Sequence, residues 1–324
     1  MNSIQDQTPL FTIITPTLNA SSTVEEAISS VLAQGVPCEH LVMDGGSSDR
    51  TVEIASSFPQ CTVHSGRDRG LYDAMNRGAF FARGEWLVFL QADDWLPDGA
   101  LAAWREAIQA NPGAEIITGS AEAVRTVGDG VLEREWRKTD AHLKELTVQN
   151  LALGEPMINA RAIRKSLFKK VGPFDLAFSL ASDRDFLLKL AKSQPHYVSI
   201  EAMTYRYRWH EGSRTMNAGN SLSRRLTAEN LAIARKHLAY PSWGAEDKRA
   251  LAEWHSRQSV QAAMCAIEAF DPVGFLSVIP AAMRRDPTWL FAFAGEFACG
   301  AMGWVKRGFK TRSQLSFQKT HKIL

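Results

Sequence analysis

Short apolar runs alternate with amphipathic stretches through the first third of the chain. Apolar and β-branched runs predict buried strands at residues 10–15, 39–43, 61–64, 86–90 and 115–118. Periodic stretches between them predict helices at residues 24–34, 50–57, 71–82 and 101–110. Strands that alternate with helices form right-handed βαβ units, so the pattern predicts an α/β fold with a mostly parallel central sheet flanked by helices.

Polar residues stand where several of these strands end. Thr15, Asp44 and Asp93 each occupy such a position. Ligands of doubly wound sheets bind outside the carboxyl ends of the parallel strands. We therefore expect these residues to meet at one edge of the sheet and to form one ligand site there.

The pattern changes after residue 120. Gly128-Asp129-Gly130 predicts a hairpin turn between two exposed strands, and residues 197–209 are strand-like and aromatic. Residues 162–171 predict a basic amphipathic helix, and residues 183–192 predict another helix with Ser182 as its N-cap. From residue 222 onward nearly the whole chain has a helical pattern.

Two adjacent acids follow the most apolar of the predicted strands. Asp93 and Asp94 come directly after the run 86–90 and the pair Gln91-Ala92. Carboxylate oxygens are preferred ligands of Mg²⁺ and Mn²⁺, which keep substrate phosphates as further ligands. Aspartate is also a favoured N-cap, so the pair could instead cap a helix that begins near Pro97. The pair alone does not decide between metal binding and capping.

Composition and charge exclude several classes of protein. The chain has 324 residues, of which 45% are hydrophobic and 22% charged, as in ordinary globular proteins. A net charge of +2 gives no indication of a nucleic-acid partner. The four cysteines have neither metal-ligand spacing nor a disulfide framework, which favours reduced thiols. Residues 1–9 lack the layout of a signal peptide, so we expect a cytoplasmic protein.

Common fingerprints of other nucleotide-binding and hydrolytic sites are absent from the sequence. It contains no G-x-G-x-x-G after a strand, no P-loop and no G-x-S-x-G elbow. Dinucleotide-binding enzymes, P-loop NTPases and α/β-hydrolases are therefore excluded. The remaining class is narrow: α/β proteins that bind phosphate groups with paired acids at a strand end.

Five motifs follow one another in a fixed order. They are TPTLN at 15–19, DGGSSDRT at 44–51, DRGLYDAMNRG at 68–78, GEW at 84–86 leading to ADD at 92–94, and VGPFD at 171–175 before ASDRDF at 181–186. In this order they resemble the family-2 inverting glycosyltransferases with a GT-A fold. The resemblance covers roughly residues 10–215.

The resemblance implies a site for a nucleotide-sugar donor. Pro16, Thr17 and Asn19 resemble the first-strand loop that meets the base and ribose. Asp44 resembles the acid that hydrogen-bonds the base. The family often has two adjacent acids there, whereas this chain has Gly45 in second place. Without the neighbouring motifs, Gly45 and Gly46 would be read only as a strand-to-helix turn.

The resemblance also implies contacts with the diphosphate and a metal. Asp68 or Arg69 is placed to reach the base or the diphosphate. Asp93 resembles the acid that contacts the ribose, and Asp94 resembles the acid that binds a divalent metal, Mn²⁺ or Mg²⁺. His210 resembles a loop histidine near the diphosphate or metal, and it could equally be a structural histidine beside its aromatic neighbour.

The catalytic base implied by the resemblance is Asp183, with Asp185 as its close competitor. A single carboxylate base and no covalent nucleophile give direct displacement, so the anomeric configuration inverts. Asp183 could instead only stabilise the first turn of a helix. We interpret Tyr72 and Met75, three residues apart, as core packing rather than ligand contacts.

The end of the chain combines an apolar run with a basic tail. Residues 289–305 are apolar except for Glu296, and after it six lysines and arginines follow without an acid. The run is at the short limit for a membrane span. An apolar segment with basic residues suits an anionic membrane surface, and packing on the catalytic domain is the alternative.

These observations predict a metal-dependent inverting glycosyltransferase that uses a nucleotide-diphosphate sugar, with a UDP-sugar as the favoured donor. The expected acceptor is a glycan or lipid-linked saccharide of cell-surface polysaccharide synthesis, reached at the inner face of the cell membrane. Residues 1–120 would form the nucleotide-sugar half of the catalytic domain, 121–220 the acceptor half, and 221–324 a helical region that associates with membrane.

Two other functions remain open from the sequence. A sugar-phosphate nucleotidyltransferase shares the sheet and the metal-binding acids, but it normally has a glycine-rich, basic loop after the first strand. Residues 15–22 contain neither glycine nor lysine. A non-catalytic nucleotide-sugar-binding or scaffold protein is the second alternative, although the acids Asp93, Asp94 and Asp183 favour an enzyme.

Overall fold

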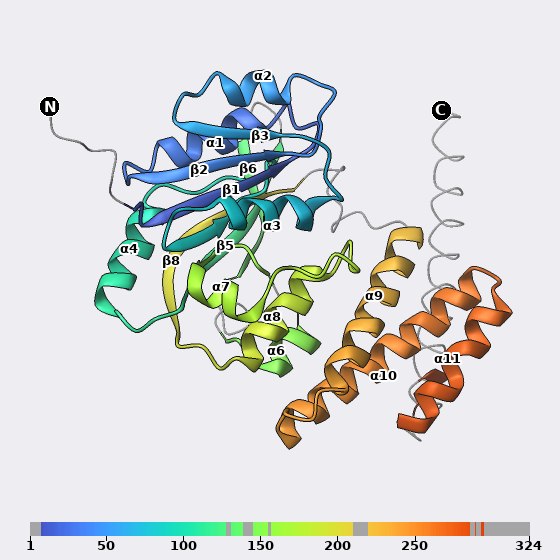
Figure 1. The fold of residues 1–324 in the computed structure, drawn as a ribbon. Helices are drawn as coiled ribbons and strands as arrows, with labels where there is room; N and C mark the ends of the chain where they lie inside the picture. The colour runs from blue at the N-terminus through green and yellow to red at the C-terminus, as the bar shows by residue number, and fades with distance from the viewer. Residues whose placement is uncertain are drawn as a thin grey trace, which may run out of the picture. The chain divides into compact units, whose positions relative to one another are not determined.

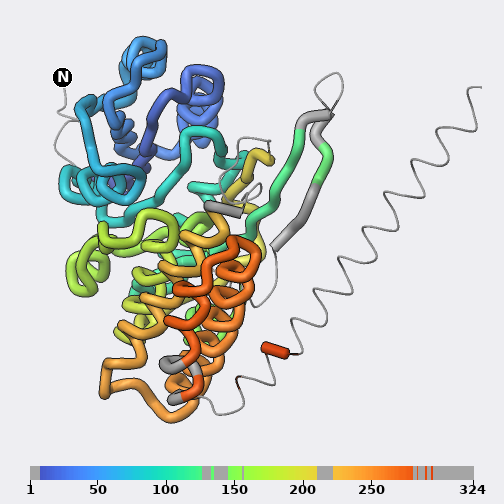
Figure 2. Tube along the Cα trace, turned by 90° about the vertical axis from the view of Figure 1, so that its right-hand side faces the viewer, coloured from blue at the N-terminus to red at the C-terminus, as the bar shows by residue number. Residues whose placement is uncertain are grey.

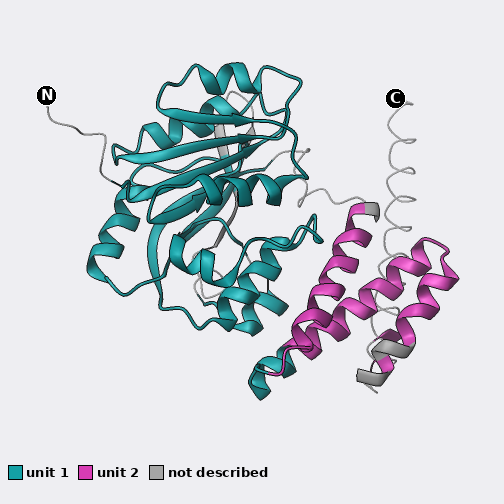
Figure 3. Ribbon diagram, viewed as in Figure 1, with its two compact units in different colours: residues 1–219, 242–250 teal, residues 220–241, 251–324 magenta. Residues whose placement is uncertain are grey.

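The computed structural model describes residues 8–127, 131–138, 145–154, 157–209, 220–285, 289 and 293–294. These residues form two compact units, which are coloured separately in Figure 3. The first unit contains the described residues up to 209 and, later in the chain, Ser242–Ala250. The second contains Asn220–Pro241 and the described residues from Leu251 onward.

A parallel sheet forms the N-terminal part of the first unit (Figure 1). Its strands are β1 (Phe11–Thr17), β2 (Cys38–Asp44), β3 (Cys61–Ser65) and β4 (Trp86–Phe89), in the order β3-β2-β1-β4. The pairings among these strands are parallel, as predicted. Strands β1 and β4 are buried along their whole length, as expected at the centre of an α/β sheet.

Helices follow each of these strands. They are α1 (Val24–Leu32), α2 (Thr51–Ser56), α3 (Leu71–Phe81) and α4 (Ala100–Ala110). Their apolar residues recur at helical spacing, and in α1 the buried ones are Val24, Ala27, Ile28 and Val31. Helix α3 lies so close to β1 that a Cβ atom at Gly78 would be 2.4 Å from Ile14 Cγ2. Gly78, the last residue of the DRGLYDAMNRG motif, therefore allows the close approach of helix and sheet.

Strand β7 (Arg161–Arg164) runs antiparallel between β4 and β5 (Ile116–Val127). The single helix predicted at residues 162–171 is therefore wrong at its start, because α7 spans only Lys165–Val171. Ala162 and Ile163 are fully buried and pair with strands on both sides. Four residues are too few for periodicity to separate strand from helix, so the pairing partners decide.

Strands β5, β6 (Val131–Lys138) and β8 (Tyr197–Arg208) complete the sheet. Strands β5 and β6 pair antiparallel up to Val127 and Val131, which agrees with the predicted hairpin, and its turn at 128–130 lies outside the described residues. Figure 2 shows the two strands running side by side. Strand β8 pairs parallel with β5, so an aromatic strand from late in the chain joins the sheet at β5.

Helices α6 (Val148–Leu153) and α8 (Ser182–Lys192) pack on one another. The predicted capping role of Ser182 is wrong: Ala181 is the N-cap, and Ser182 Oγ donates instead to the Asp175 carbonyl at 2.8 Å. Phe186 of α8 packs on Phe174, with ring centroids 4.6 Å apart. This aromatic contact fixes the start of α8 against the chain before it.

The second unit is helical, as predicted from residue 222 onward for the part of it that is described. It contains α9 (Asn220–Leu238), most of α10 (Ala245–Glu268) and α11 (Pro272–Arg285). Residues Phe275, Val278 and Ile279 of α11 pack on a small core of Val260, Ala263 and Trp289. Among the helices described, none has the length and apolarity required to cross a bilayer.

Candidate active site

The ends of β1 and β2 meet as predicted, at Thr17 and Asp44. The two residues are register partners, and Thr17 Oγ1 donates to Asp44 Oδ1 at 3.4 Å. Thr15, in contrast, lies inside β1 with its hydroxyl 2.9 Å from His40 Nε2, so its predicted place at the strand end is wrong. Pro16 is likewise a buried residue of β1. The polar edge of the sheet therefore begins at Thr17.

Asp44 is fully buried and organises the glycine turn that follows it. Its carboxylate accepts hydrogen bonds from the amides of Gly46 at 3.0 Å and Ser47 at 3.1 Å, and from the hydroxyl of Ser65 at 2.7 Å. The Ser47 hydroxyl donates to it as well. Burial acts to raise the pKa of Asp44, but the hydrogen bonds from Ser47 and Ser65 outweigh it and lower the pKa. Asp44 is thus an ionised anchor of the loop.

Asn19 links the loop after β1 to the loop after β2. Its backbone has a positive φ of 52°, its amide donates to Ser47 Oγ at 2.8 Å, and its Oδ1 accepts from the Ser48 amide at 2.9 Å. Asparagine tolerates this left-handed conformation better than most residues. The TPTLN and DGGSSDRT motifs are therefore joined into one structure at the sheet edge.

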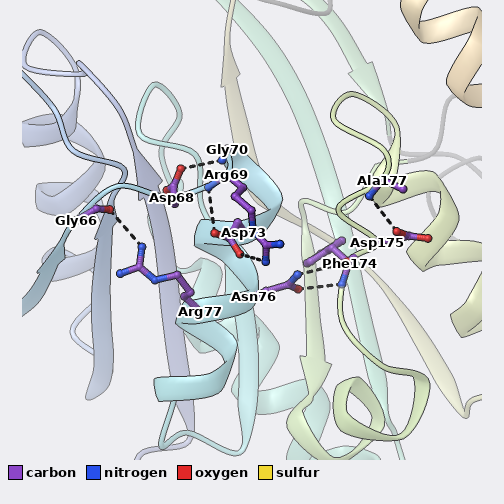
Figure 4. Close-up of polar contacts among 10 residues, drawn as sticks. All are labelled: Gly66, Asp68, Arg69, Gly70, Asp73, Asn76, Arg77, Phe174, Asp175 and Ala177. Carbon is purple, nitrogen blue, oxygen red and sulfur yellow. Dashed lines mark hydrogen bonds and ion pairs between the residues drawn. The ribbon is translucent and has the colours of Figure 1, made fainter.

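Asp68 occupies the space beside Gly45. A Cβ atom on Gly45 would lie 2.9 Å from Asp68 Oδ2, and Asp68 Oδ1 accepts a hydrogen bond from the Gly70 amide at 2.8 Å. At the position where the resemblance implies a second acid, this chain has Gly45, and the loop before α3 places the Asp68 carboxylate beside it. Arg69 is exposed and pairs with Asp73 of α3 at 3.3 Å, as Figure 4 shows.

Helix α3 is also fixed at its other side. The amide group of Asn76 donates to the Phe174 carbonyl and accepts from the Phe174 amide, each at 2.9 Å. Figure 4 shows these two contacts between α3 and the segment before α8. The DRGLYDAMNRG motif thus positions both the loop that carries Asp68 and the chain that leads to Asp183.

Asp94 is held by the end of β8. Its side chain is 4% exposed, and it accepts hydrogen bonds from Tyr205 Oη at 2.6 Å and from the Arg208 amide at 2.9 Å. Arg208 Nε donates to the Asp93 carbonyl at 3.1 Å, and its guanidinium lies 4.8 Å from the Trp95 ring centroid. Helix α4 begins at Ala100 with Gly99 as its N-cap, which excludes the capping alternative for the two acids.

The surroundings of Asp94 fit a divalent cation. Burial and the neighbouring Asp93 carboxylate both raise the pKa of Asp94, so a cation would relieve the cost of ionising it. Each Asp94 oxygen accepts one hydrogen bond within the described chain, which leaves a lone pair on each. His210 lies outside the described residues, and the described residues alone contain no group of three metal-binding side chains.

The structure separates the two candidate bases on α8. Asp183 is half-buried in the first turn, whereas Asp185 is fully buried and has no surface for a substrate. Asp183 Oδ1 accepts hydrogen bonds from Tyr72 Oη at 3.0 Å and from the Arg184 amide at 2.9 Å. Burial raises the pKa of Asp183, and these hydrogen bonds act against it. A raised pKa suits a carboxylate that takes up a proton.

Tyr207 connects the two acids Asp94 and Asp183. Its ring lies 4.7 Å from that of Tyr205, and the Asn159 side chain hydrogen-bonds it. Burial first, and then the negative charges of Asp94 and Asp183, raise the pKa of Tyr207 well above its ordinary value. The charges of both acids therefore act on the same partly buried phenol, which indicates that they lie in one region of the first unit.

Three tyrosines of the site were not predicted from the sequence. Tyr72 does pack in the core, with 6% of it exposed and its ring 5.5 Å from Phe174, but its hydroxyl also reaches Asp183. Tyr205 and Tyr207 alternate along β8 and so share one face of it. That alternation in the sequence YRYRW was the signal that could have placed them together.

The fold defines a class: it is of the GT-A type, the fold of glycosyltransferases. The sequence profile "Glycosyl transferase family 2" matches residues 12–172. A "PGL/p-HBAD biosynthesis glycosyltransferase" of Mycobacterium bovis (strain BCG / Pasteur 1173P2) is 32% identical over 190 residues, which cover 56% of this chain and 69% of that protein. The chain therefore belongs to glycosyl transferase family 2 and is a glycosyltransferase.

Solved structures share the fold at low sequence identity. S. aureus TarS superposes with a TM-score of 0.59 at 17% identity, over 86% of this chain and 50% of TarS, so the chain spans about half of that protein. Residues 1–349 of TarS, solved in complex with UDP-GlcNAc, superpose with a TM-score of 0.53 at 16% identity. The match covers 85% of this chain and 91% of that structure. The mannosyltransferase PcManGT from Pyrobaculum calidifontis, solved in complex with GDP-Man and Mn²⁺, superposes with a TM-score of 0.58 at 17% identity. The match covers 95% of this chain and 84% of PcManGT.

Proposed function

We propose that this glycosyltransferase is metal-dependent and inverting, and that it transfers a sugar from a UDP-sugar to a saccharide acceptor. The observation that carries the proposal is the tyrosine setting of the two acids: Tyr205 donates to Asp94 and packs on Tyr207, and the charges of both Asp94 and Asp183 raise the pKa of Tyr207. It supports a candidate metal ligand and a candidate base in one region, as direct displacement requires.

The donor nucleotide would lie along the edge formed by Thr17, Asn19, Asp44 and Asp68. Asp44 holds the glycine turn in place, and the Asp68 carboxylate lies directly against it. Asp93 would contact the ribose, and Arg69, which is exposed, would reach the diphosphate. We favour UDP because TarS, with the same fold, was solved with UDP-GlcNAc. PcManGT, solved with GDP-Man, makes GDP the main competitor.

Asp94, together with Asp93 and His210, would hold Mn²⁺ or Mg²⁺. When bound, such an ion supplies electrostatic stabilisation of the negative charge that develops on the leaving diphosphate. Asp183 would take the proton from the acceptor hydroxyl, and Tyr72 would hold the Asp183 carboxylate in orientation. The acceptor oxygen forms a bond to the anomeric carbon while the bond from that carbon to the diphosphate oxygen breaks. The product has inverted configuration because the two bonds lie on opposite faces.

We propose a glycan or lipid-linked saccharide of cell-surface synthesis as the acceptor, reached from the cytoplasm. The relative from M. bovis is named for a role in PGL/p-HBAD biosynthesis, which supports an acceptor of this general kind. The apolar run at 289–305 and the basic residues after it would bring the enzyme to an anionic membrane surface.

Calorimetric titration of UDP, GDP and dTDP, each with Mn²⁺ and with EDTA, tests the donor and metal assignments. We expect UDP to bind in the presence of Mn²⁺ and to bind at least about tenfold more weakly with EDTA or in Asp94→Ala. Asp98→Ala, in the exposed segment before α4, is a matched control that retains binding. A folded protein that binds none of the nucleotides would contradict the proposal and favour a scaffold role.

A further inference from the structure

The second unit carries an exposed apolar surface where α10 ends and α11 begins. Phe270 is 94% exposed, Val273 76% and Leu276 63%. Ile267, near the end of α10, and Met283, two turns beyond Leu276 on the same side of α11, are partly exposed. We call these five residues the corner face. Single exposed apolar residues are common, but a cluster of large ones marks a surface that contacts something apolar.

Helix α11 is apolar on two sides, of which one is covered. Phe275, Val278 and Ile279 pack on the small core of the unit. Val273 and Leu276 lie three residues apart on another side of the same helix, and neither belongs to that core. The exposed side is therefore not needed to hold α11 on that core.

Phe270 occupies a backbone position that favours glycine. Its φ is 53°, and the Asp271 amide reaches back to the Ala266 carbonyl at 2.9 Å, which is the hydrogen bond of a Schellman motif. A left-handed residue other than glycine is strained, and an exposed side chain gains no packing in return. The fold thus tolerates strain in order to present a phenylalanine ring outside the unit.

The chain that follows the corner face indicates what covers it. Residues 289–305 are apolar except for Glu296, and six lysines and arginines follow without an acid. A second copy of the chain would bring two such basic tails together, which charge repulsion disfavours. Anionic phospholipid instead matches both the apolar face and the positive tail.

The corner itself carries two acids, so the attraction to negative lipid has to come from the tail. Asp271 accepts a hydrogen bond from the Gly274 amide at 2.8 Å, so its charge lies at the N-terminus of α11 where the helix dipole compensates it. Glu268 is exposed next to Phe270. The corner therefore supplies apolar contact, and the tail supplies the attraction to negative lipid.

We propose that the corner face inserts into the headgroup region of an anionic membrane while the basic tail binds its surface charge. Insertion of the corner face is argued from its own exposed residues, whereas the attraction of the basic tail to anionic lipid, and access to a lipid-linked acceptor as its purpose, rest on the proposed function. Phe270, Val273 and Leu276 are the residues that enter the lipid.

Phe270→Gly distinguishes this proposal from a structural role. Glycine removes the backbone strain at φ 53° and loses no packing, so the Tm rises, while vesicle binding falls because the ring is lost. The full chain is sedimented with vesicles of phosphatidylcholine alone and with added phosphatidylglycerol. Phe80→Ser, at a residue of the first unit that is 81% exposed, is the matched control and leaves binding unchanged.

The triple variant Phe270→Ser, Val273→Ser and Leu276→Ser should lower partition into the anionic vesicles by at least about tenfold. Unchanged partition of this variant, or no binding of the wild type to anionic vesicles, would overturn the proposal. A loss of oligomeric mass in light scattering would also overturn it, because the face would then join two copies. UDP titration on the same samples keeps the outcomes apart, since a wild type that binds vesicles but no nucleotide contradicts only the proposed function.

Discussion

The hydroxyl of Tyr72 lies 3.0 Å from Asp183 Oδ1, across 111 residues of sequence. The same hydroxyl is 3.1 Å from the Leu180 carbonyl, so its one hydrogen is directed to either oxygen. When it points to Asp183 it stabilises the ionised carboxylate and orients it. Tyr72 is therefore placed to influence when Asp183 can accept a proton.

Tyr72→Phe should move the acidic limb of the pH–rate profile to higher pH. Burial already raises the pKa of Asp183, and the Tyr72 hydrogen bond lowers it, so removing that bond raises the pKa further. A base works only when ionised, so activity then begins at higher pH. A hydrogen bond to a charged group is worth about 1.5–3 kcal/mol. At pH values below the pKa of Asp183, we therefore expect kcat of Tyr72→Phe to be about tenfold or more lower than that of the wild type.

The phenylalanine ring keeps its contact with Phe174, so the Tm serves as the control for packing. A pH–rate profile of Tyr72→Phe that coincides with the wild type would show that Asp183 does not act as the base.

Asp183→Asn and Asp185→Asn should differ in kind. The first removes the proposed base from a half-buried position, and we expect kcat to fall by about 10²–10⁴-fold with UDP binding retained. The second changes a fully buried carboxyl, so it lowers the free energy of unfolding while the folded fraction stays active. Steady-state kinetics together with urea denaturation separates the two. The reverse pattern would assign the base to Asp185.

Gly45→Ala should weaken nucleotide binding without unfolding the protein. The new methyl group would lie 2.9 Å from Asp68 Oδ2, and the flexible Asp68 side chain can rotate away. We expect the Kd for UDP to rise by about tenfold, since the displaced carboxylate loses its place beside residue 45. Gly113→Ala is the control, because a Cβ there makes only ordinary contact with His196. Equal affinities in the two variants would remove Asp68 from the donor site.

Glu39→Gln should lower the free energy of unfolding and make that free energy depend less on pH in the acid range. Glu39 accepts hydrogen bonds from Thr12 Oγ1, Arg83 N and Arg83 Nε at 2.6–2.7 Å. Burial acts to raise the pKa of Glu39, but these hydrogen bonds outweigh it and lower the pKa. Its stabilisation is therefore complete above the unfolded-state pKa and is lost as pH falls through the folded-state pKa.

We expect Glu39→Gln to lower the free energy of unfolding by about 1–3 kcal/mol at neutral pH, and by progressively less in acid. Denaturant titrations over a series of pH values measure this. A difference from the wild type that stays constant down to low pH would show that the Glu39 charge is not involved.

The strands and helices of the first 110 residues were predictable because each has a strong local signal. Alternating apolar runs and helical spacing gave β1 to β4 and α1 to α4 to within a few residues. The start of β7 was not predictable, since Arg161–Arg164 is short, basic at both ends and buried only by its neighbours. Local periodicity carries no information about such distant partners.

The site was predictable only where a motif marks it. Asp44, Asp94 and Asp183 stand in recognisable segments, and the charges of the last two both raise the pKa of Tyr207. The contacts of Tyr72 and Tyr205 with these acids depend on sequence separations of more than a hundred residues. The contact between Gly45 and Asp68 is a question of shape, which no spacing of residues in the sequence expresses.

The reversed strand β7 has a consequence for how the protein is made. Strand β4 ends at Phe89, but the strand that pairs with its free edge ends at Arg164. At ribosomal rates of roughly 5–20 residues per second, that buried edge waits for several seconds without its partner. An unpaired apolar edge is a template for aggregation, so the nascent chain is vulnerable in this interval. Expression of fragments that end before Arg164 should therefore give insoluble protein, and a chaperone bound during synthesis would protect this edge first.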